Sequence, residues 1–385
     1  MTEYEWDVSE LDVLDGIRDL ARSDRNAALA TIVAVEGSAY RRPGAKMTVE
    51  QDGTGQGYIT AGCIEDEVLE LVETVLERGE ATLETYDLME DDDIWGLGLG
   101  CNGIIDVLVD PIDESYDPLA RAVDRGEPIG VITVLAGNDR DGEALPTGAR
   151  AYFRDGEIAL IDDLPQWLLD GIAGPVAELL EAGKSQVVSI EQAEASAEVF
   201  IDGIQPPPRL VVLGSGPDVG PMIDLGKKNG FRVEVVGFRG GVELEEEFPG
   251  ADEHRSTTPA SLVDVIDPDG RTYVTVMTHN FVDDRIAVEE LLNTDVPYIG
   301  LMGPRKRFEE MLAEFEQEGT TFDETELEPL YTPVGLNLGA GSPYGIATSV
   351  ISEILAVHND REPIHLKERD GPIHDRVSVD AAPTD

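Results

Sequence analysis

The stretch LVVLGSGPDVGPMIDLGKKNGFRVEVVGFR, residues 210–239, decides the fold. It opens with the apolar run 210–213, as expected for a parallel strand that is covered on both faces. A glycine turn, Gly214-Ser215-Gly216, and an apolar-periodic helix follow, and residues 232–236 form the next predicted strand. The order strand, turn, helix, strand predicts an α/β unit of the nucleotide-binding kind.

The ligand of this unit is left open by three departures from a dinucleotide site. Val219 replaces the third glycine, so we expect the helix to pack less closely on the strand. Pro217 lacks an N–H donor, and Asp218 brings a negative charge to the place of a pyrophosphate. Gly237 stands where a carboxylate would hold the ribose, while Arg239 would suit a phosphate. The unit therefore either binds no dinucleotide or binds another phosphorylated ligand.

The composition indicates a folded, very acidic protein. The 385 residues carry a formal charge of −51, yet 41% are hydrophobic and the apolar runs are regular. We interpret the spread of acids as a surface suited to a salt-rich cytoplasm, where screening weakens self-repulsion. Nucleic-acid binding is excluded because no basic stripe exists, and we expect neither a membrane span nor a signal peptide.

Two cysteines in a chain of this length do not make a disulfide framework, which favours a reducing cytoplasm. They also exclude a zinc site built on cysteine alone. Cys63 follows Gly62 at a predicted strand-to-helix turn, where the helix dipole would favour a thiolate. Cys101 and Asn102 lie in a glycine-rich loop. The alternative for Cys63 is a small packing residue, and two converging thiols would suit a soft metal or a sulfur carrier.

The chain in order predicts an acidic amphipathic helix, an αβ domain and the Rossmann-like domain. The boundaries that we expect are 1–24 for the helical region, 25–204 for the αβ domain with a middle region at 117–203, 205–366 for the Rossmann-like parallel-sheet domain, and 367–385 for a disordered acidic tail. The expected helices are 3–21, 62–77, 167–181 and 346–357. The expected strands outside the nucleotide-binding unit are 27–35, 45–49, 58–60, 81–86, 104–109, 128–135, 150–154, 185–191, 272–277 and 298–301.

Positive charge gathers in two places in this acidic chain. Arg41, Arg42 and Lys46 form one cluster between two predicted strands, and an anionic ligand would explain it better than pairing with nearby acids. Arg305 and Lys306 belong to a second cluster at another strand-to-helix junction.

His279 ends a predicted strand at the sheet edge where α/β ligands bind, and a hydrogen-bonded loop residue is the alternative. No histidine pair has metal-ligand spacing, and no nucleophile elbow of the hydrolase type is present.

Seven motifs, taken in order, resemble the XdhC/CoxI family of molybdenum-hydroxylase accessory proteins, here with the acidic composition of a haloarchaeal member. They are ATIVAVEGSAYRRPGAKM (30–47), YITAGCIEDEV (58–68), GLGLGCNGIIDVLVDP (96–111), VVLGSGPDVGP (211–221), VMTHNF (276–281), YIGLMGPRKR (298–307) and PVGLNLGAGSPYGIATSVISEILAV (333–357).

The resemblance implies a cytoplasmic protein, not strictly an enzyme, that binds molybdenum cofactor and supports its sulfuration and insertion. The implied client is a molybdenum hydroxylase of the xanthine dehydrogenase or carbon monoxide dehydrogenase type, with a cysteine desulfurase as a further partner and a homodimer left open. One or the other cationic cluster would hold the phosphate or pterin, and the two cysteines would lie near molybdenum or take part in sulfur handover. The glycine turn at 214–216 would bind a phosphate or nucleotide portion.

This sequence departs from the family pattern at Asn102, where a glycine is common, and at Gly237, where an acid is common. Two other function classes therefore stay open. One is an NAD(P)-dependent oxidoreductase in which Arg239 reads a 2′-phosphate, and the other is a nucleotide-binding regulatory module.

Overall fold

The computed structural model describes residues 4–5, 8–37, 39–88, 103–160, 162–238, 240 and 243–370. These residues form two compact units that divide between Pro206 and Pro207. We call them unit 1 and unit 2.

Unit 1 begins with a six-stranded mixed sheet, sheet A. Its spatial order is β1 (Tyr4–Glu5), β4 (Gly55–Gly57), β3 (Lys46–Glu50), β2 (Ala27–Gly37), β6 (Gly103–Pro111) and β5 (Thr82–Asp87). Helix α1 (Glu10–Ala21) contacts β3 and β4, and α2 (Glu65–Arg78) covers β2 and β6. Val68, Val72 and Val75, one face of α2, are buried against the sheet, as the apolar spacing of the helix requires.

The second part of unit 1 is a five-stranded antiparallel sheet, sheet B. Its spatial order is β10 (Ser185–Gln192), β11 (Ala195–Ile204), β7 (Ile129–Asn138), β8 (Arg150–Arg154) and β9 (Glu157–Leu160). The 3-10 turn η1 (Glu114–Tyr116) and helix α4 (Asp117–Arg125) connect the two sheets along the chain, and α5 (Gln166–Ala182) covers sheet B.

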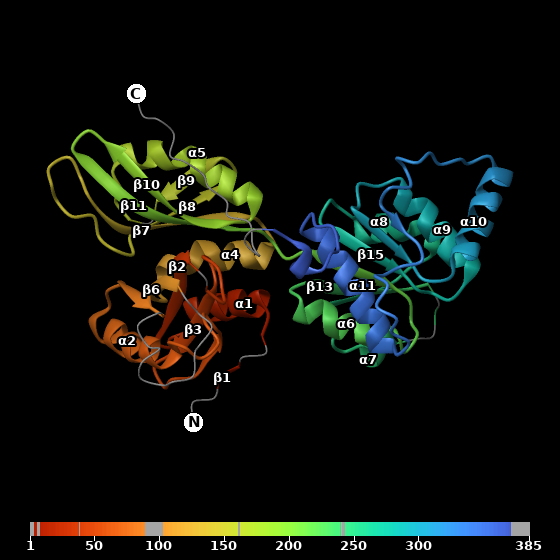
Figure 1. Cartoon of the computed structure of the whole chain (residues 1–385), viewed down its shortest axis with the longest axis horizontal. Helices are drawn as coiled ribbons and strands as arrows, with labels where there is room; N and C mark the ends of the chain where they lie inside the picture. The colour runs from red at the N-terminus through yellow and green to blue at the C-terminus, as the bar shows by residue number, and fades with distance from the viewer. Residues whose placement is uncertain are drawn as a thin grey trace. The chain divides into compact units, whose positions relative to one another are not determined.

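The two sheets of unit 1 pack on each other (Figure 1). Val33 and Leu108 of sheet A share a buried cluster with Leu135 and Phe200 of sheet B. Because α2 and α5 cover the other faces, unit 1 is built of four layers: helix, sheet, sheet, helix.

Unit 2 is a doubly wound α/β fold around a six-stranded parallel sheet, sheet C. The spatial order is β14 (Glu253–Ser256), β13 (Arg232–Gly237), β12 (Arg209–Leu213), β15 (Thr272–Val276), β16 (Tyr298–Leu301) and β17 (Leu330–Tyr331). In chain order this is 3-2-1-4-5-6, so the direction of winding reverses between β12 and β15. The predicted fold class, an amino-terminal αβ part followed by a Rossmann-like parallel sheet, is confirmed.

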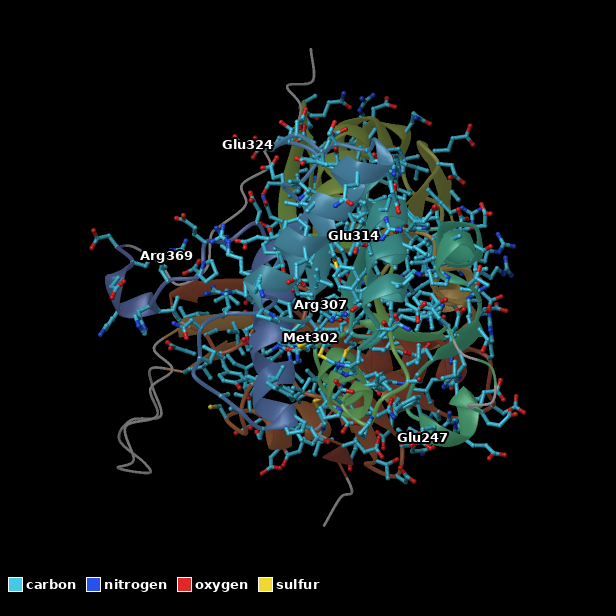
Figure 2. All side chains as sticks on the ribbon, turned by 90° about the vertical axis from the view of Figure 1, so that its right-hand side faces the viewer. Glu247, Met302, Arg307, Glu314, Glu324 and Arg369 are labelled. Carbon is cyan, nitrogen blue, oxygen red and sulfur yellow. The ribbon has the colours of Figure 1, made fainter. Side chains whose placement is uncertain are left out.

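Helices cover both faces of sheet C (Figure 1). On one face α6 (Val219–Lys228) packs beside α11 (Pro343–His358), and on the other lie α8 (Leu262–Ile266), α9 (Phe281–Leu292) and α10 (Arg305–Glu318). The short elements are α7 (Leu244–Glu247), η2 (Pro259–Ser261) and η3 (Leu366–Glu368). Figure 2 labels Glu247 and Glu314, acids on α7 and α10, and Glu324 in the turn region after α10.

Helix α6 approaches the sheet closely in spite of Val219. Val219 is fully buried, and a side chain on Gly226 would come within 2.8 Å of Leu210 and 3.0 Å of Val233. The close approach that the missing third glycine was expected to prevent is therefore provided by a glycine in the last turn of the helix.

The bounds of three expected elements are wrong. The first helix begins at Glu10 because Ser9 and Asp12 form a capping box. The strand expected at 58–60 is β4, three residues earlier, and α2 begins at Glu65 instead of residue 62. Several elements were also not predicted, among them β9, β11, β14, α4 and α9. The predicted disordered tail, 367–385, lies mostly outside the described residues. In the described part of the chain, no helix combines the length and the apolar character that crossing a membrane requires.

Candidate functional site

The first cationic cluster lies at a cavity of about 440 Å³ in unit 1. Residues 40–46, which we call the basic loop, lead from β2 into β3 and form one side. Ser185, Asp202 and their neighbours on β10 and β11 form another side, and Glu10 and Leu14 of α1 complete the lining. The site is thus assembled from both sheets.

Arg41 is held by neighbours within unit 1. Its Nη2 is ion-paired with Oε1 of Glu10, and its guanidinium carbon lies 4.6 Å from the centre of the Tyr58 ring. Its side chain is only 19% exposed. The charge of Arg41 is therefore already shared between a carboxylate and an aromatic face.

Lys46 is buried and fixes the basic loop to sheet B. Its Nζ donates to Oδ2 of Asp202 at 2.6 Å and to the carbonyl oxygen of Gly44 at 2.8 Å. The Ser185 hydroxyl donates to Oδ1 of Asp202 at 2.6 Å. A buried pair with both partners hydrogen-bonded needs no external anion, so Lys46 acts here as a structural cation.

Arg42 differs from its two neighbours. Its Nε is buried without a hydrogen-bond partner, and within the residues that the structure describes the side chain makes no ion pair. A buried guanidinium nitrogen that lacks an acceptor is costly. In a chain with 79 acidic residues, this is the cation of the cavity that an added anion would satisfy.

A smaller cavity of about 30 Å³ lies behind the Lys46–Asp202 pair, between the sheets. It is also lined by Arg150, which is ion-paired with Asp110, and by Tyr116. Burial raises the pKa of the Tyr116 hydroxyl well above 10, so this group stays neutral. The volume suits a water molecule and no organic ligand.

The turn that carries Gly62 and Cys63 is closed by Glu65. The buried carboxylate accepts from the backbone N–H groups of Thr60, at 2.8 Å, and of Gly62, at 3.0 Å. Cys63 is partly buried, and its N–H donates to the Thr60 hydroxyl at 3.1 Å. The backbone N–H groups of this turn are thus occupied within it, by the carboxylate of Glu65 and the hydroxyl of Thr60. The other two residues of the thiol hypothesis, Cys101 and Asn102, lie outside the described residues.

At the carboxyl edge of sheet C, the glycine turn meets the end of β15. A side chain on Gly214 would lie 2.8 Å from the carbonyl oxygen of Met277. His279, with φ 58°, places Nε2 2.8 Å from Oδ2 of Asp218. Gly214, Ser215, Gly216 and His279 therefore lie at one edge of the sheet, and the contact between Asp218 and His279 lies beside the glycine turn. Arg239 is outside the described residues.

The second cationic cluster divides into one paired and two exposed residues. Arg307 is ion-paired with Asp284, whose Oδ1 accepts from the Thr278 hydroxyl at 2.5 Å. Arg305 and Lys306 have side chains 82% exposed and stand 3.9 and 3.5 Å from acids one turn later in α10. Figure 2 labels Met302, which directly follows β16, and Arg307, in the first turn of α10. The two exposed cations project from a helix and line none of the cavities described above.

The functional partners that sequence reasoning missed are Asp202, Ser185 and Glu65. The first two lie on strands of sheet B, and one of these strands was not predicted. The signal available for Glu65 was its position five residues after Thr60, with a glycine between them. Among the described residues, no three histidine, cysteine or acidic side chains converge as a metal site.

Comparisons with known proteins agree with this architecture. A family model described as the XdhC Rossmann domain matches residues 210–354, and one described as the XdhC and CoxI family matches residues 20–87. The chain belongs to the XdhC and CoxI family.

One of two relatives extends over most of the chain. The chain is 29% identical over 341 residues, 87% of its length, to a Bacillus subtilis strain 168 protein named as a probable xanthine dehydrogenase subunit, of which 94% is covered. It is 29% identical over 163 residues to the uncharacterized protein YqeB of Escherichia coli strain K12, covering 42% of this chain and 29% of that one.

A crystal structure described as a xanthine dehydrogenase from Bacillus halodurans superposes with a TM-score of 0.71 and 27% identity, covering 93% of this chain and 97% of the other. Together these similarities support an accessory role of the XdhC type.

Proposed function

We propose that this protein binds molybdenum cofactor in the cavity of unit 1 and supports its sulfuration and its insertion into a xanthine-dehydrogenase-type hydroxylase. The observation that carries the proposal is the state of Arg42. Arg42 lines the cavity and makes no ion pair among the described residues, while the neighbouring Arg41 and Lys46 are already paired. An anionic cargo in the cavity would supply the missing counterion of its guanidinium.

The residues of the cavity fit such a cargo. The cofactor combines a phosphate with a pterin, and a guanidinium can donate two parallel hydrogen bonds to a phosphate. A volume of about 440 Å³ lies within the usual range for small-molecule sites. On this proposal Arg42 binds the phosphate, Lys46 and Asp202 set the position of the loop, and the chain carries the cofactor without chemical turnover.

The test is metal and pterin analysis of protein expressed in a cofactor-producing host and purified at high salt. The wild type is compared with Arg42→Gln and with Arg78→Gln, which removes the same charge from the exposed end of α2. We expect near-equal molybdenum and pterin in the wild type and in Arg78→Gln. A charge-assisted hydrogen bond of about 1.5–3 kcal/mol predicts a roughly tenfold or greater loss of affinity in Arg42→Gln.

Cys63→Ala and Cys101→Ala, analysed in the same way, test the thiols. If they act in sulfur transfer alone, the variants will retain cofactor but will not activate a xanthine-dehydrogenase-type partner. Wild-type protein that is free of molybdenum and pterin, even after incubation with released cofactor, would refute the proposal. Equal cofactor content in Arg42→Gln and Arg78→Gln would refute the assigned site.

A further inference from the structure

Tyr40 is an aromatic residue of the cavity to which the proposed function gives no role. It is the first residue of the basic loop, lines the cavity and is 58% exposed. Large exposed aromatic side chains bring an apolar face into water, and at a concave site they commonly serve as contact surfaces. The packing of the core does not explain its position, because it belongs to none of the buried clusters of unit 1.

The ring of Tyr40 packs near the ring of Tyr58. The centre of the Tyr58 ring lies 6.2 Å away with an angle of 42° between the ring planes. Arg41 lies over Tyr58, and Glu10 pairs with Arg41. Carboxylate, guanidinium and two rings therefore follow one another in contact, and this arrangement limits the movement of Tyr40 before any ligand arrives.

The arrangement also explains why Arg41 and Arg42, adjacent in sequence, act differently. Arg41 has its charge engaged with Glu10 and Tyr58, so its role is to position the aromatic pair. Arg42 has no partner of this kind in the described part of the chain and faces the cavity with Tyr40. The loop thus offers one aromatic face and one available cation.

We propose that Tyr40 is a stacking platform for a planar heteroaromatic ring whose anionic substituent is held by Arg42. The proposed function identifies this ring as the pterin of the natural ligand, and in that respect the inference rests on the proposed function. Inorganic phosphate has no aromatic face, so a site for phosphate alone would depend on Arg42 and be indifferent to Tyr40. Dependence on both residues is the signature of the ring-and-anion site.

The probe is pterin-6-carboxylate, a fluorescent, planar and anionic pterin, whose binding is followed by fluorescence polarisation on the full chain at high salt. Tyr40→Leu should raise its Kd about tenfold, since base–aromatic stacking is worth roughly that factor or more. Tyr40→Phe keeps the ring and should stay within about twofold of the wild type. Arg42→Gln should weaken binding about as much as Tyr40→Leu.

The matched control is Tyr344→Leu, which removes a tyrosine of similar exposure, 53%, from unit 2 and should leave the Kd unchanged. Thermal unfolding of each variant confirms that the fold is intact. Equal affinity of Tyr40→Leu and wild type, or equal competition by inorganic phosphate and the pterin, would overturn the platform.

Cofactor content, measured on the same variants, separates this inference from the proposed function. If the protein retains molybdenum cofactor but its Kd for the probe does not depend on Tyr40, only the proposal that Tyr40 is a stacking platform is contradicted. Protein that binds the probe through Tyr40 but never retains molybdenum cofactor contradicts only the proposed function and leaves the ring-and-anion site standing.

Discussion

The cavity of unit 1 and the carboxyl edge of sheet C both gather cations beside glycine turns, yet they differ in what remains available. At the cavity, Arg41 and Lys46 are paired, whereas Arg42 makes no ion pair among the described residues. At the edge of sheet C, Arg307 also has a buried Nε without an acceptor but is paired with Asp284, and the exposed Arg305 stands near an acid of its own helix. The number of cations in a motif therefore says less about binding than the pairing of each cation and the shape around it.

The largest expected effect tests whether Lys46 is structural. Lys46→Met leaves Asp202 as a buried carboxylate without its ion partner, which should lower the free energy of unfolding by about 3–5 kcal/mol. Urea unfolding at constant high salt measures this loss. Lys306→Met, which removes an exposed cation from unit 2, should change stability by less than about 0.5 kcal/mol.

The double variant Lys46→Met/Asp202→Leu should recover most of that stability, because no buried charge remains. A single Lys46→Met variant as stable as the wild type would mean that Lys46 is available to a ligand, and the contrast drawn between Arg42 and Lys46 would be lost.

A second effect tests the contact between the basic loop and sheet B. Gly44 has φ 96°, and a side chain there would lie 2.4 Å from Oγ of Ser185. Gly62 has the same φ, but a side chain there would meet no atom of the described residues within 4 Å. Gly44→Ala should therefore lower the free energy of unfolding by about 1–3 kcal/mol and exceed the loss in Gly62→Ala, which reports backbone strain alone. Equal losses in urea unfolding would contradict the close contact.

A third effect tests whether Asp218 prevents nucleotide binding at the glycine turn of unit 2. We expect no saturable binding of NADPH by the wild type at millimolar concentration, because Asp218 places a carboxylate beside the glycine turn. Asp218→Asn removes that charge and should tighten binding about fivefold, the order of one exposed charge interaction. The initial slope of the NADPH fluorescence titration, which is proportional to 1/Kd below saturation, measures the change, with Glu245→Gln on α7 as the control for net charge. Saturation of the wild type at micromolar NADPH would instead support the oxidoreductase alternative.

The smallest effect concerns alkaline pH. Burial, with Glu84 and Glu67 nearby, raises the pKa of Tyr86 in unit 1 from 10.0 to about 12. The folded state thus holds this proton more tightly than the unfolded state. The contribution of Tyr86 to the free energy of unfolding is therefore fully present below pH 10 and is lost as the pH rises toward about 12. Because Tyr86 is only half-buried, solvent screening keeps the change small.

In Tyr86→Phe, the free energy of unfolding of unit 1 should depend less on pH between 10 and about 12 than it does in the wild type. In unit 2, burial and Glu353 raise the pKa of Tyr298 in the same direction, so the slope that Tyr298 contributes should persist in Tyr86→Phe. Urea unfolding across this pH range makes the comparison, and a Tyr86→Phe curve parallel to that of the wild type would show that Tyr86 does not titrate as described.

The sequence was a good guide where local pattern decides the outcome. The apolar run 210–213, the glycine turn and the cations that end α6 placed three elements of unit 2 within a residue or so, because a buried parallel strand and a helix terminus have local signatures. The junction before Arg305 and the position of His279 followed from the same patterns.

The candidate site was harder to predict because its decisive contacts join distant parts of the chain. Asp202 lies among buried residues of β11, and an acid at such a position argues against a strand when only the sequence is known. Its partner Lys46 lies on another sheet, so sequence proximity gives no sign of the pair. Arg41 and Arg42 are alike in sequence, and only the positions of Glu10 and Tyr58 separate a paired cation from an available one. Glu65 could not be identified as the residue that closes the turn at Gly62 until the helix start was known.

The fastening of the basic loop to β10 and β11 has a consequence for genetics. A screen for variants that fold but no longer retain cofactor should collect substitutions in two separate windows, 40–46 and 183–204, with few in the long stretch between them. A map of such variants along the chain would look like two unrelated functions. Second-site suppressors of a change in one window should fall in the other, because both windows line one cavity and Lys46 of the first is ion-paired with Asp202 of the second.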